Sequence, residues 1–443
     1  MDISKNAQMI IEMLEKSGFE AYAVGGCVRD FIMKRPCSDI DITTSAMPQS
    51  VEKVFDDYNV RYIETGLKHG TITALFGGES FEVTTYRIDG DYKDNRHPDK
   101  VEFVTDIKGD LARRDFTINA MAYNHKDGIV DLFGGQQDIE NKLIRAVGNA
   151  DKRCKEDSLR IMRAIRFASV LSFDIEENTR KAIFDNKELL KNVSYERIYN
   201  ELSKLLMGDN VYNILVEYKE IIGVIIPELV PIFNVEQNTS WHIYDVWHHT
   251  AKTVESAPKD LALRYTMLLH DIGKAYMKTT DENGIDHFKG HQAVSAQYAA
   301  PALKRLKAPN CVYERAMAII PIHDMHIGIK RNNVKKWLSK LGEEVLRDLI
   351  AVKRADKLAQ NPMKTEEELA KLVITEQLLN SILEDGEPFS LKDLDINGKD
   401  LMALGFEGRQ IGEALELVLE KVVDNELENK KDVLISYIKS INK

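Results

Sequence analysis

Two aspartates separated by a single residue, Asp39 and Asp41, have the type and spacing to do chemistry. They lie in SDIDITTS, which predicts a short strand, and side chains two residues apart on a strand point to the same face. Ile40 would then point into the core. Converging carboxylates suit Mg²⁺, which binds one or two carboxylates together with substrate phosphates, and two such ions can promote nucleotidyl transfer. Alone, the motif is more often an acidic pair that faces solvent.

A glycine pair in VGGCVRD, Gly25 and Gly26, follows a predicted strand and precedes a predicted helix that carries Arg29. Glycines let backbone N–H groups approach a phosphate, and an arginine adds a charge-assisted donor. A tight strand-to-helix turn is the alternative. The nearness of this motif to the acidic pair favours a phosphate site. We expect a third carboxylate from Glu82 in SFEVTTYR, for which an outward-facing charge is the alternative.

The segment EDSLRIMRAIRF has helical periodicity and repeats polar residues every third position. On a helix, steps of three place Asp157, Arg160, Arg163 and Arg166 along one side. A carboxylate acceptor beside an arginine fork can read the edge of a cytosine or adenine without a nucleic-acid template. The alternative is a surface ion pair between Asp157 and Arg160, worth only a few tenths of a kcal/mol.

A second constellation of histidines and aspartates lies between residues 241 and 356. Its members are His249, His270, Asp271, His291, His323 and Asp356. Imidazole and carboxylate ligands on successive helices suit a divalent transition metal, and the His-Asp doublet places two ligands in one turn. Each histidine alone would more often be an ordinary core or surface residue.

The elements that must position these residues change in type along the chain. Up to residue 150, the runs EAYAVGG, DIDITTS, TITALF and FEVTTYR predict strands, and GGES predicts a hairpin turn. The polar stretch YRIDGDYKDNRHPDKVEF predicts a long loop. From Asp151 the periodicity is helical. We therefore expect an α+β fold with a small mixed sheet in the head and mostly helices after it. The expected domains are 1–150, 151–233, 234–360 and 361–443.

Composition excludes several classes of protein. The chain has 443 residues, of which 44% are hydrophobic and 30% charged, enough for several cores and unlike disordered or collagen sequences. No apolar run approaches the roughly 18 residues of a membrane span, and the amino terminus reads as an amphipathic helix rather than a signal peptide. We expect a cytoplasmic protein. The net charge of −11 argues against bulk-charge binding of nucleic acid, and we expect no DNA partner. The four cysteines read as reduced, incidental thiols.

The motifs of the first half resemble, in order, those of class II tRNA nucleotidyltransferases, the bacterial and eukaryotic CCA-adding enzymes, whose superfamily includes bacterial poly(A) polymerases. The motifs are VGGCVRD, SDIDITTSA, RRDFTINAMAY, DLFGGQQDIENKLIRAVG and EDSLRIMRAIRF. The resemblance implies that Asp39 and Asp41 bind catalytic Mg²⁺, that Gly26 and Arg29 contact the triphosphate, and that Asp157 and Arg160 form an amino-acid template. With the residues taken from the glycine motif and the helix spacing, the predicted nucleotide-binding set is Gly25, Gly26, Arg29, Arg114, Asp115, Asn119, Asp157, Arg160, Arg163 and Arg166.

Within that set, the resemblance gives Arg114, Asp115 and Asn119 the recognition of the ribose. The alternative for RRDFTINA is that its two arginines are basic surface residues that precede an N-capped helix. Glu196 and Arg197 resemble the next family motif, and we expect them to contact the template residues rather than the nucleotide.

The histidine-rich region resembles an HD-superfamily phosphohydrolase domain, because LLHDIGK is followed by a downstream aspartate. The resemblance implies that His249, His270, Asp271 and Asp356 bind a first metal (Ni, Mn, Co or Fe). His291 and His323 would then line a second metal or phosphate position, and the site would hydrolyse phosphoesters or 2′,3′-cyclic phosphates. The alternative is a degenerate HD fold that serves as a platform for tRNA.

The tail resembles the tRNA-contacting segment of these enzymes, although Glu407 and Arg409 depart from the usual proline-containing turn, and a coiled interaction helix is the alternative. The predicted function is addition of CCA to the 3′ end of tRNA from CTP and ATP. The alternatives are a CC-adding, A-adding or poly(A) enzyme, or a non-catalytic RNA-binding or nucleotide-sensing protein. The long segment carrying Arg87, Arg96 and His97 favours an enzyme able to add the terminal A.

Overall fold

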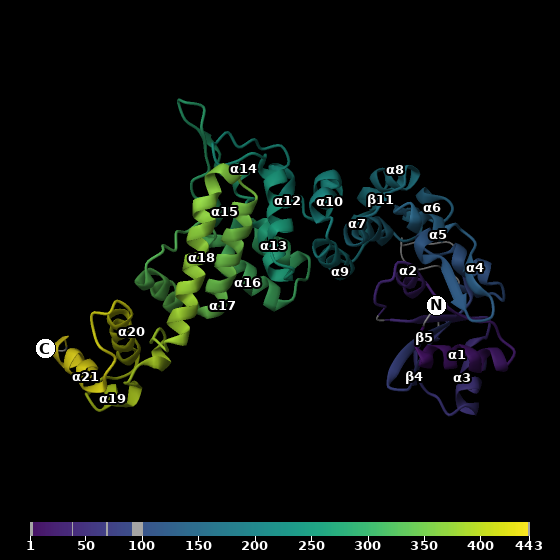
Figure 1. The fold of residues 1–443 in the computed structure, drawn as a ribbon, viewed down its shortest axis with the longest axis horizontal. Helices are drawn as coiled ribbons and strands as arrows, with labels where there is room; N and C mark the ends of the chain where they lie inside the picture. Colours follow the sequence, from purple (N-terminus) through teal and green to yellow (C-terminus); the bar gives the residue numbers. More distant parts are fainter. Residues whose placement is uncertain (1–2, 38, 68–69, 91–100, 442–443) are drawn as a thin grey trace. The chain divides into compact units, whose positions relative to one another are not determined.

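The computed structural model describes residues 3–37, 39–67, 70–90 and 101–441. The chain divides into two compact units, Met1–Pro227 and Glu228–Lys443 (Figure 1). The first unit contains the mixed sheet and the helices that follow it, and the second is almost entirely helical, which confirms the predicted fold class. In the part of the chain that the structure describes, no helix is both long and apolar enough to cross a bilayer.

A seven-stranded sheet forms the head of the first unit, in the order β3-β4-β5-β2-β1-β8-β9. Its strands are β1 (Ala21–Val24), β2 (Asp41–Thr44), β3 (Arg61–Gly66), β4 (Thr71–Phe76), β5 (Glu79–Thr85), β8 (Met121–Asn124) and β9 (Gly128–Asp131). Strands β2 and β5 run parallel, and every other neighbouring pair is antiparallel. The strands predicted from EAYAVGG, TITALF and FEVTTYR are confirmed.

The predicted hairpin turn at GGES is confirmed. Phe76 pairs with Glu79, which leaves Gly77 and Gly78 as the two turn residues. Their φ angles of +60° and +83° are the positive values that a tight hairpin turn requires and that glycine adopts without strain.

The segment predicted as one long loop has paired ends. Strands β6 (Arg87–Asp89) and β7 (Val101–Phe103) form an antiparallel ladder that starts and closes the segment. Residues 91–100 between them, which include Arg96 and His97, lie outside the described residues.

Helices cover the sheet of the head through apolar faces. Helix α1 (Lys5–Lys16) buries Ile10, Ile11 and Leu14, the residues whose spacing predicts an amphipathic helix, and it contacts β1 and α3 (Pro48–Asp57). Figure 1 shows α1 and α3 beside β4 and β5. The resulting core stabilises the head. Short loops at the edge of the sheet can then carry polar residues.

The rest of the first unit is a set of short helices and two-residue strands. They are α2 (Gly26–Ile32), α4 (Ile107–Ala112), η2 (Thr117–Asn119), α5 (Gly135–Glu140), β10 (Leu143–Ile144), α6 (Ala150–Glu156), α7 (Leu159–Leu171), β11 (Asp174–Ile175), α8 (Glu177–Asp185), η3 (Lys187–Asn192), α9 (Tyr195–Leu206), α10 (Val211–Glu217) and α11 (Lys219–Ile225). The 3₁₀ helix η4 (Pro227–Ile232) follows. Helix α7 packs against α9 and α10, and its arginines bond Asp115, which lies two residues before η2, and Glu201 of α9.

The second unit starts with a bundle of longer helices. They are α12 (Val246–Ser256), α13 (Leu261–Leu269), α14 (Lys274–Met277), α15 (His291–Arg305), α16 (Asn310–Ile319), η5 (Ile320–Ile322), α17 (Arg331–Leu358) and α18 (Pro362–Glu384), with a small hairpin of β12 (Thr279–Thr280) and β13 (Asp286–His287). Helix α17 is interrupted at Gly342, whose φ of +75° is not helical. It contacts α12, α13, α16 and α18, so it connects most of the bundle.

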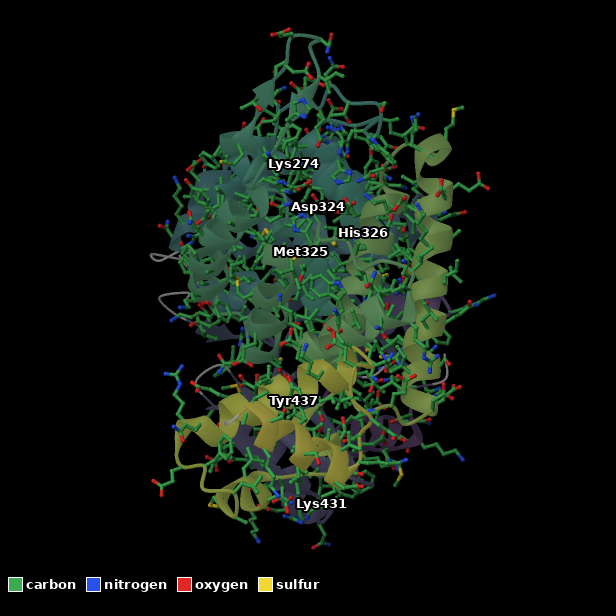
Figure 2. The ribbon with its side chains drawn as sticks, turned by 90° about the vertical axis from the view of Figure 1, so that its left-hand side faces the viewer. Lys274, Asp324, Met325, His326, Lys431 and Tyr437 are labelled. Carbon is green, nitrogen blue, oxygen red and sulfur yellow. The ribbon has the colours of Figure 1, made fainter. Side chains whose placement is uncertain are left out.

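The tail of the second unit has a small core of its own. It comprises η6 (Leu391–Asp393), α19 (Gly398–Met402), α20 (Arg409–Val423) and α21 (Lys431–Ile441). Leu401, Val418 and Leu434 lie in a buried cluster shared by these helices. Figure 2 labels Lys431 and Tyr437 on α21.

Candidate functional site

Asp41 feels the charge of two other predicted carboxylates, Glu82 and Asp39, near the point where β2 and β5 run side by side, although the three do not form one of the close groups of ligand atoms found among the described residues. Asp41 is the first residue of β2, and Glu82 precedes Val83, the residue that pairs with Ile42. Burial among protein atoms raises the pKa of Asp41, and the negative charges of Glu82 and Asp39 raise it further, while Arg114 lowers it. Such crowding of like charges suits a divalent cation with oxygen ligands, so these residues fit the predicted Mg²⁺.

The expectation that Asp39 lies on the same strand is wrong. Strand β2 begins only at Asp41, and Asp39 belongs to the loop before it. There the backbone carbonyl of Asp39 accepts a hydrogen bond from Cys37 Sγ at 3.2 Å, a local contact that competes with sheet pairing. Ile40 packs against the core of the head, as predicted. The loop, not strand alternation, therefore brings Asp39 near Asp41.

The glycine pair lies against two guanidinium groups. Gly25 has φ +83°, and a Cβ placed on it would lie 3.1 Å from Arg114 Nη1, while one on Gly26 would lie 3.6 Å from Arg29 Nη2. Arg29 Nη1 donates to Asn119 Oδ1 at 2.7 Å. The structure thus brings together the predicted glycines and three of the predicted polar residues, with the lack of a Cβ leaving room for the arginines.

A buried charge network continues from Asn119 onto helix α7. Asp115 accepts hydrogen bonds from Asn119 Nδ2 at 3.1 Å and from Arg163 Nε and Nη2 at 2.8 and 2.6 Å. Burial raises the pKa of Asp115, but the Arg163 charge and these hydrogen bonds outweigh it and hold the pKa well below its usual range. Asp115 is therefore a carboxylate that fixes both a predicted ribose contact and a helix arginine.

Glu201 and Phe167 complete this network and were not predicted. Glu201 on α9 is buried and accepts from Arg166 Nε at 2.8 Å, with Arg163 Nη1 at 3.5 Å. The Arg166 guanidinium lies 3.5 Å from the ring centre of Phe167, and Arg29 lies 5.1 Å from it. The available signal was Glu201 itself, a charge on the apolar face of a strongly amphipathic helix.

Asp157 does not lie on a helix, so the predicted line of residues three apart starts only at Arg160. Asp157 ends α6 with extended backbone (φ −133°, ψ 102°), and α7 starts at Leu159. Its Oδ2 accepts from Arg197 Nη2 at 2.8 Å, whereas Arg160 Nη1 donates to Glu156 Oε2 at 2.8 Å. The alternative of an ion pair between Asp157 and Arg160 is therefore wrong. Each residue has another partner that orients it, and Arg197 contacts Asp157 as expected.

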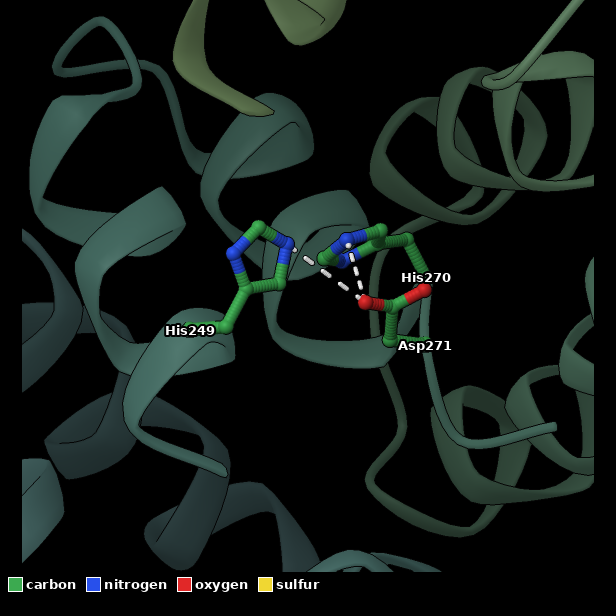
Figure 3. Close-up of side chains that lie close together, drawn as sticks. All are labelled: His249, His270 and Asp271. Atoms are coloured by element: carbon green, nitrogen blue, oxygen red, sulfur yellow. Dashed lines mark ion pairs between the residues drawn. The ribbon is translucent and has the colours of Figure 1, made fainter. Parts of the chain in front are cut away.

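The second unit gathers all six predicted histidine and aspartate residues. His249 comes from α12, His270 ends α13, Asp271 follows it, His291 begins α15, His323 follows η5 and Asp356 lies on α17. His249 Nε2 lies 3.5 Å from Asp271 Oδ2 and 3.0 Å from Asp356 Oδ1, and His270 Nε2 lies 3.2 Å from Asp271 Oδ2 (Figure 3). The ligand atoms of His249, His270 and Asp271 form one group able to hold a metal ion, and Asp356 lies beside it.

A second group shares Asp271 with the first. His291 Nε2 lies 3.3 Å from Asp271 Oδ1 and 3.3 Å from His323 Nε2. The Nδ1 atoms of His270, His291 and His323 are 2.7, 2.8 and 2.7 Å from the carbonyl oxygens of Met267, Phe288 and Ile320. These bonds favour the tautomer whose Nε2 carries a lone pair, which leaves that nitrogen available to a metal ion held beside Asp271.

The centre of these groups is buried, and Asp271 Oδ2 there lies 2.8 Å from Lys274 Nζ and 3.2 Å from His270 Nε2. Burial raises the pKa of Asp271, yet the nearby His270 and Lys274 hold it well below its usual range. Buried imidazole and carboxylate groups gathered this closely are the ligands that a divalent transition metal prefers. The residues therefore fit the predicted transition metal.

A cavity of about 660 Å³ opens onto both groups. Of the six predicted ligands, Asp271, His291, His323 and Asp356 line it, together with Lys274, Lys289, Gln360 and Asp324. Lys274 Nζ lies 2.8 Å from Asp271 Oδ2, and Figure 2 labels Lys274 and Asp324 in this part of the unit. The cavity is large enough for a phosphate ester beside the metal ligands.

Comparison with known proteins gives three matching family models. The model described as the Poly A polymerase head domain matches residues 21–145, an RNA- and SrmB-binding site of polymerase A matches 172–231, and tRNA nucleotidyltransferase domain 2 matches 288–438. The first of these covers the sheet, the glycine pair and the three carboxylates.

Among curated relatives, a CCA-adding enzyme of Lactobacillus delbrueckii is 51% identical over 207 residues, and in that comparison the chain spans about half the length of the relative. A CCA-adding enzyme of Staphylococcus saprophyticus is 32% identical over 439 residues, 98% of each chain. Among solved structures, the Bacillus stearothermophilus CCA-adding enzyme in complex with CTP matches with a TM-score of 0.73 and 29% identity, over 99% of this chain and 97% of that one. Full-length similarity, together with the head site, shows that this chain belongs to the CCA-adding enzyme family.

Proposed function

We propose that this chain adds CCA to the 3′ end of tRNA from CTP and ATP, without a nucleic-acid template. One observation carries the proposal: the guanidinium groups against Gly25 and Gly26, the carboxylates Asp41 and Glu82, and the oriented residues Asp157 and Arg160 belong to one unit. The names of the full-length relatives and the CTP bound in the Bacillus stearothermophilus structure support it.

In this proposal, Asp39 and Asp41 hold Mg²⁺, and Glu82 completes the acidic group. When bound, Mg²⁺ supplies activation of the attacking 3′ hydroxyl and neutralisation of charge on the triphosphate. Arg29 and Arg114, which lie against the glycine pair, bind and orient the phosphates, because planar guanidinium groups match phosphate oxygens in pairs.

Selection of the sugar and base falls to residues whose partners already fix them. Asn119 is held by Arg29 and Asp115, so its remaining polar capacity points to a defined ribose hydroxyl. Asp157 offers an acceptor and Arg160 offers donors to the base edge, each oriented by a partner on the other side. Polar groups that are fixed in this way discriminate between bases, because a wrong base leaves these groups without hydrogen-bond partners.

We assign nucleotidyl transfer to residues 1–150, base choice and RNA contact to 151–233, the metal groups to 234–360, and a further tRNA contact to 361–443. A role in tRNA maturation assigns the protein to the cytoplasm. These assignments follow the positions of the sites described above and the family models.

The test is incubation of the purified chain with tRNA that ends at the discriminator base, with CTP, ATP and Mg²⁺, followed by sequencing of the product ends. Addition of CCA supports the proposal. Products that stop at CC, addition of A only to tRNA ending in CC, or long A tails identify the partial enzymes or a poly(A) polymerase. Unextended tRNA with intact tRNA binding identifies a binding protein.

A second candidate function is supported by the metal groups of the second unit. The two buried groups of ligands that share Asp271, together with the adjacent cavity, favour a metal-dependent phosphohydrolase of the HD type. When bound, a transition metal such as Ni, Mn, Co or Fe supplies Lewis-acid activation there. His249 and Asp356 would bind with the doublet, and Lys274 would orient the phosphate.

Elemental analysis of the purified chain and hydrolysis of 2′,3′-cyclic nucleotides after loading with each metal test this candidate. Bound transition metal with hydrolysis supports it. Bound metal without hydrolysis of cyclic phosphates or simple phosphoesters favours a structural metal, and absence of metal after loading favours the platform for tRNA.

A further inference from the structure

A groove leads away from the metal groups of the second unit. The cavity of about 660 Å³ at these groups shares His287 and Gln360 with a second cavity of about 680 Å³. The second cavity shares Lys357 and Glu368 with a third cavity of about 190 Å³. Asp324, which Figure 2 labels, lines all three. The cavities therefore adjoin one another, and a ligand held at the metal groups can extend along them.

The second cavity has an exposed aromatic wall. Trp241 and Ile285 both line it, and each is 43% exposed. The backbone at Trp241 is held in place by Asn361, whose N–H donates to the Trp241 carbonyl at 2.9 Å and whose Nδ2 donates to the Ser240 carbonyl at 3.2 Å. A single exposed apolar residue is common. An indole that lines a cavity between charged groups is suited to stacking of a nucleobase.

The third cavity contains an ammonium group without a counterion. Lys353 on α17 is half-buried and lines this cavity, and its Nζ donates to the backbone carbonyl of His323 at 3.3 Å. Within the described part of the chain this is its only hydrogen bond, and it forms no ion pair there, although an ammonium group has three donors. A partly buried cation in this state favours an anion in the cavity, because a charge-assisted hydrogen bond would offset its desolvation.

The other charged groups of the third cavity already have partners. Glu368 Oε1 lies 2.9 Å from Lys371 Nζ, and Asp324 Oδ2 accepts from Gln292 Nε2 at 3.1 Å. Lys357, four residues after Lys353 on α17, lines the second and third cavities and so adds positive charge on the same side of the helix. The cavity therefore offers Lys353 to an incoming anion.

We propose that this groove binds the end of a single-stranded RNA that carries a terminal phosphate, with the preceding phosphodiester at Lys353. The terminal phosphate lies at the metal groups, and the terminal base stacks on Trp241. The inference rests on the second candidate function and deepens it, because it names the substrate class as an RNA end rather than a free mononucleotide.

The order of the cavities favours a strand over a mononucleotide. In an RNA strand, the terminal nucleoside lies between its own phosphate and the preceding phosphodiester, which is the order of metal groups, aromatic wall and Lys353 along the groove. A nucleoside with one phosphate fills the first two positions and leaves Lys353 without an anion. The preceding phosphodiester supplies the oxygen acceptors that this ammonium lacks.

Tryptophan fluorescence reports on this groove without catalysis. The chain has three tryptophans, Trp241, Trp247 and Trp337, and all lie in the second unit, with Trp247 fully buried. Stacking of a base on Trp241 should quench its emission. Trp241→Leu should abolish the quenching, and Trp337→Leu, which replaces a half-buried tryptophan of α17, is the matched control that should retain it.

The experiment titrates the full-length protein with a dinucleotide that ends in a 3′-phosphate and with the same dinucleotide joined by an uncharged methylphosphonate. We expect the charged linkage to bind at least about tenfold more tightly, as expected for one hydrogen bond between charged groups. Lys353→Met should remove this advantage and leave binding of the methylphosphonate probe unchanged, whereas Lys353→Arg should retain it. Lys336→Met, which replaces an exposed lysine of the same helix that pairs with Asp424, should bind like wild type.

An advantage of the charged linkage that persists in Lys353→Met would overturn the phosphate contact, and quenching that persists in Trp241→Leu would overturn the stacking. Tighter binding of a nucleoside 3′,5′-bisphosphate than of the dinucleotide would replace the RNA strand by a small bisphosphate and so overturn the substrate class. Release of the terminal phosphate is measured separately after metal loading. Its absence, with the quenching and the effect of Lys353→Met intact, would refute the second candidate function and still support the groove.

Discussion

At the scale of single residues, the backbone of Gly25 lies so close to the guanidinium group of Arg114 that little room remains for a side chain. The φ of +83° belongs to the left-handed region, where a Cβ is strained, and a Cβ would also lie 3.1 Å from Arg114 Nη1. Gly128 has a similar φ of +72°, yet a Cβ there would meet open space. The two glycines therefore separate backbone strain from displacement of the arginine.

Gly25→Ala is expected to lower kcat/KM for both CTP and ATP by about 10²-fold, because strain of about 1–2 kcal/mol adds to a displaced phosphate-binding guanidinium. Gly128→Ala should cost similar stability with near-normal incorporation. Steady-state kinetics and Tm measure both effects. Equal loss of activity in the two variants would contradict a specific role for the position of Arg114.

Asp41→Asn is expected to abolish incorporation of CTP and ATP while leaving the fold and tRNA binding intact. Asp41 is the first residue of β2 and belongs to no buried apolar cluster, so its replacement removes a proposed metal ligand and no core packing. Asp57→Asn, an exposed aspartate at the end of α3, is the control. Incorporation assays and tRNA binding decide, and wild-type turnover of Asp41→Asn would remove this residue from the site.

Asp157→Ala and Arg160→Ala should each lower the free-energy discrimination among CTP, ATP, UTP and GTP by about 1–3 kcal/mol, since each removes a proposed polar partner of the base edge. Arg197→Ala should act in the same direction more weakly, because it only orients Asp157. Single-nucleotide incorporation with each triphosphate provides the measurement. Unchanged exclusion of UTP and GTP would mean that the base is read elsewhere.

At the scale of elements, the packing of α7 on α9 is organised around buried charge. Asp115 pairs with Arg163, and Glu201 pairs with Arg166, so arginines on one face of α7 are neutralised on both sides. Each charge is expensive to bury alone, and removal of one partner leaves the other unpaired. The network therefore couples the position of α7, which we propose takes part in base choice, to the residues that we propose bind the ribose.

Asp115→Asn should destabilise the α7–α9 region by about 3 kcal/mol at pH 7, the usual cost of breaking a buried pair. The folded pKa of Asp115 is depressed, so the stability it contributes is present above the unfolded value of about 4 and is lost as the pH falls toward the folded pKa. The difference between wild type and variant should therefore shrink below about pH 4.

Hydrogen exchange of peptides from α7 and α9, corrected for the pH dependence of the chemical step, measures this difference. Asp138→Asn is the control, because Asp138 is a buried carboxylate of the same unit that pairs with Arg145 instead. A variant difference that stays constant from pH 7 to acid would show that the charge of Asp115 does not carry the stability.

At the scale of the whole molecule, the two units carry sites of different chemistry. The head offers carboxylate oxygens alone, which suit Mg²⁺, and the second unit combines imidazole with carboxylate, which suits a transition metal. No residue of the proposed nucleotide site lies in the second unit. Loss of the second metal should therefore leave nucleotidyl transfer in place.

The double variant His270→Ala with Asp271→Ala is expected to lose tightly bound transition metal and any cyclic phosphodiesterase activity, with nucleotide addition within about twofold of wild type. His287→Ala with Asp281→Ala removes an exposed pair of the same residue types and is the control. Elemental analysis, Tm and product sequencing give the readouts, with Tm included because emptying a metal site can loosen its helices. A folded double variant that no longer adds CCA would refute the independence of the sites.

The sequence by itself determined the element types and most of the candidate residues of both sites. Alternating runs such as FEVTTYR form strands and Gly77-Gly78 forms the turn, because period and turn chemistry are local properties. The metal groups were also found from residue types alone, since histidines and aspartates that repeat on successive helices leave few other roles. The ligands predicted in the second unit are together in the structure.

Only the tertiary structure decided which groups meet. Asp157 lies outside the helix and pairs with Arg197, Asp39 precedes its strand, and Glu201 closes a network that begins at Asp115. Helical or strand period cannot give these pairings, because long-range packing selects among the many charged partners that local geometry allows.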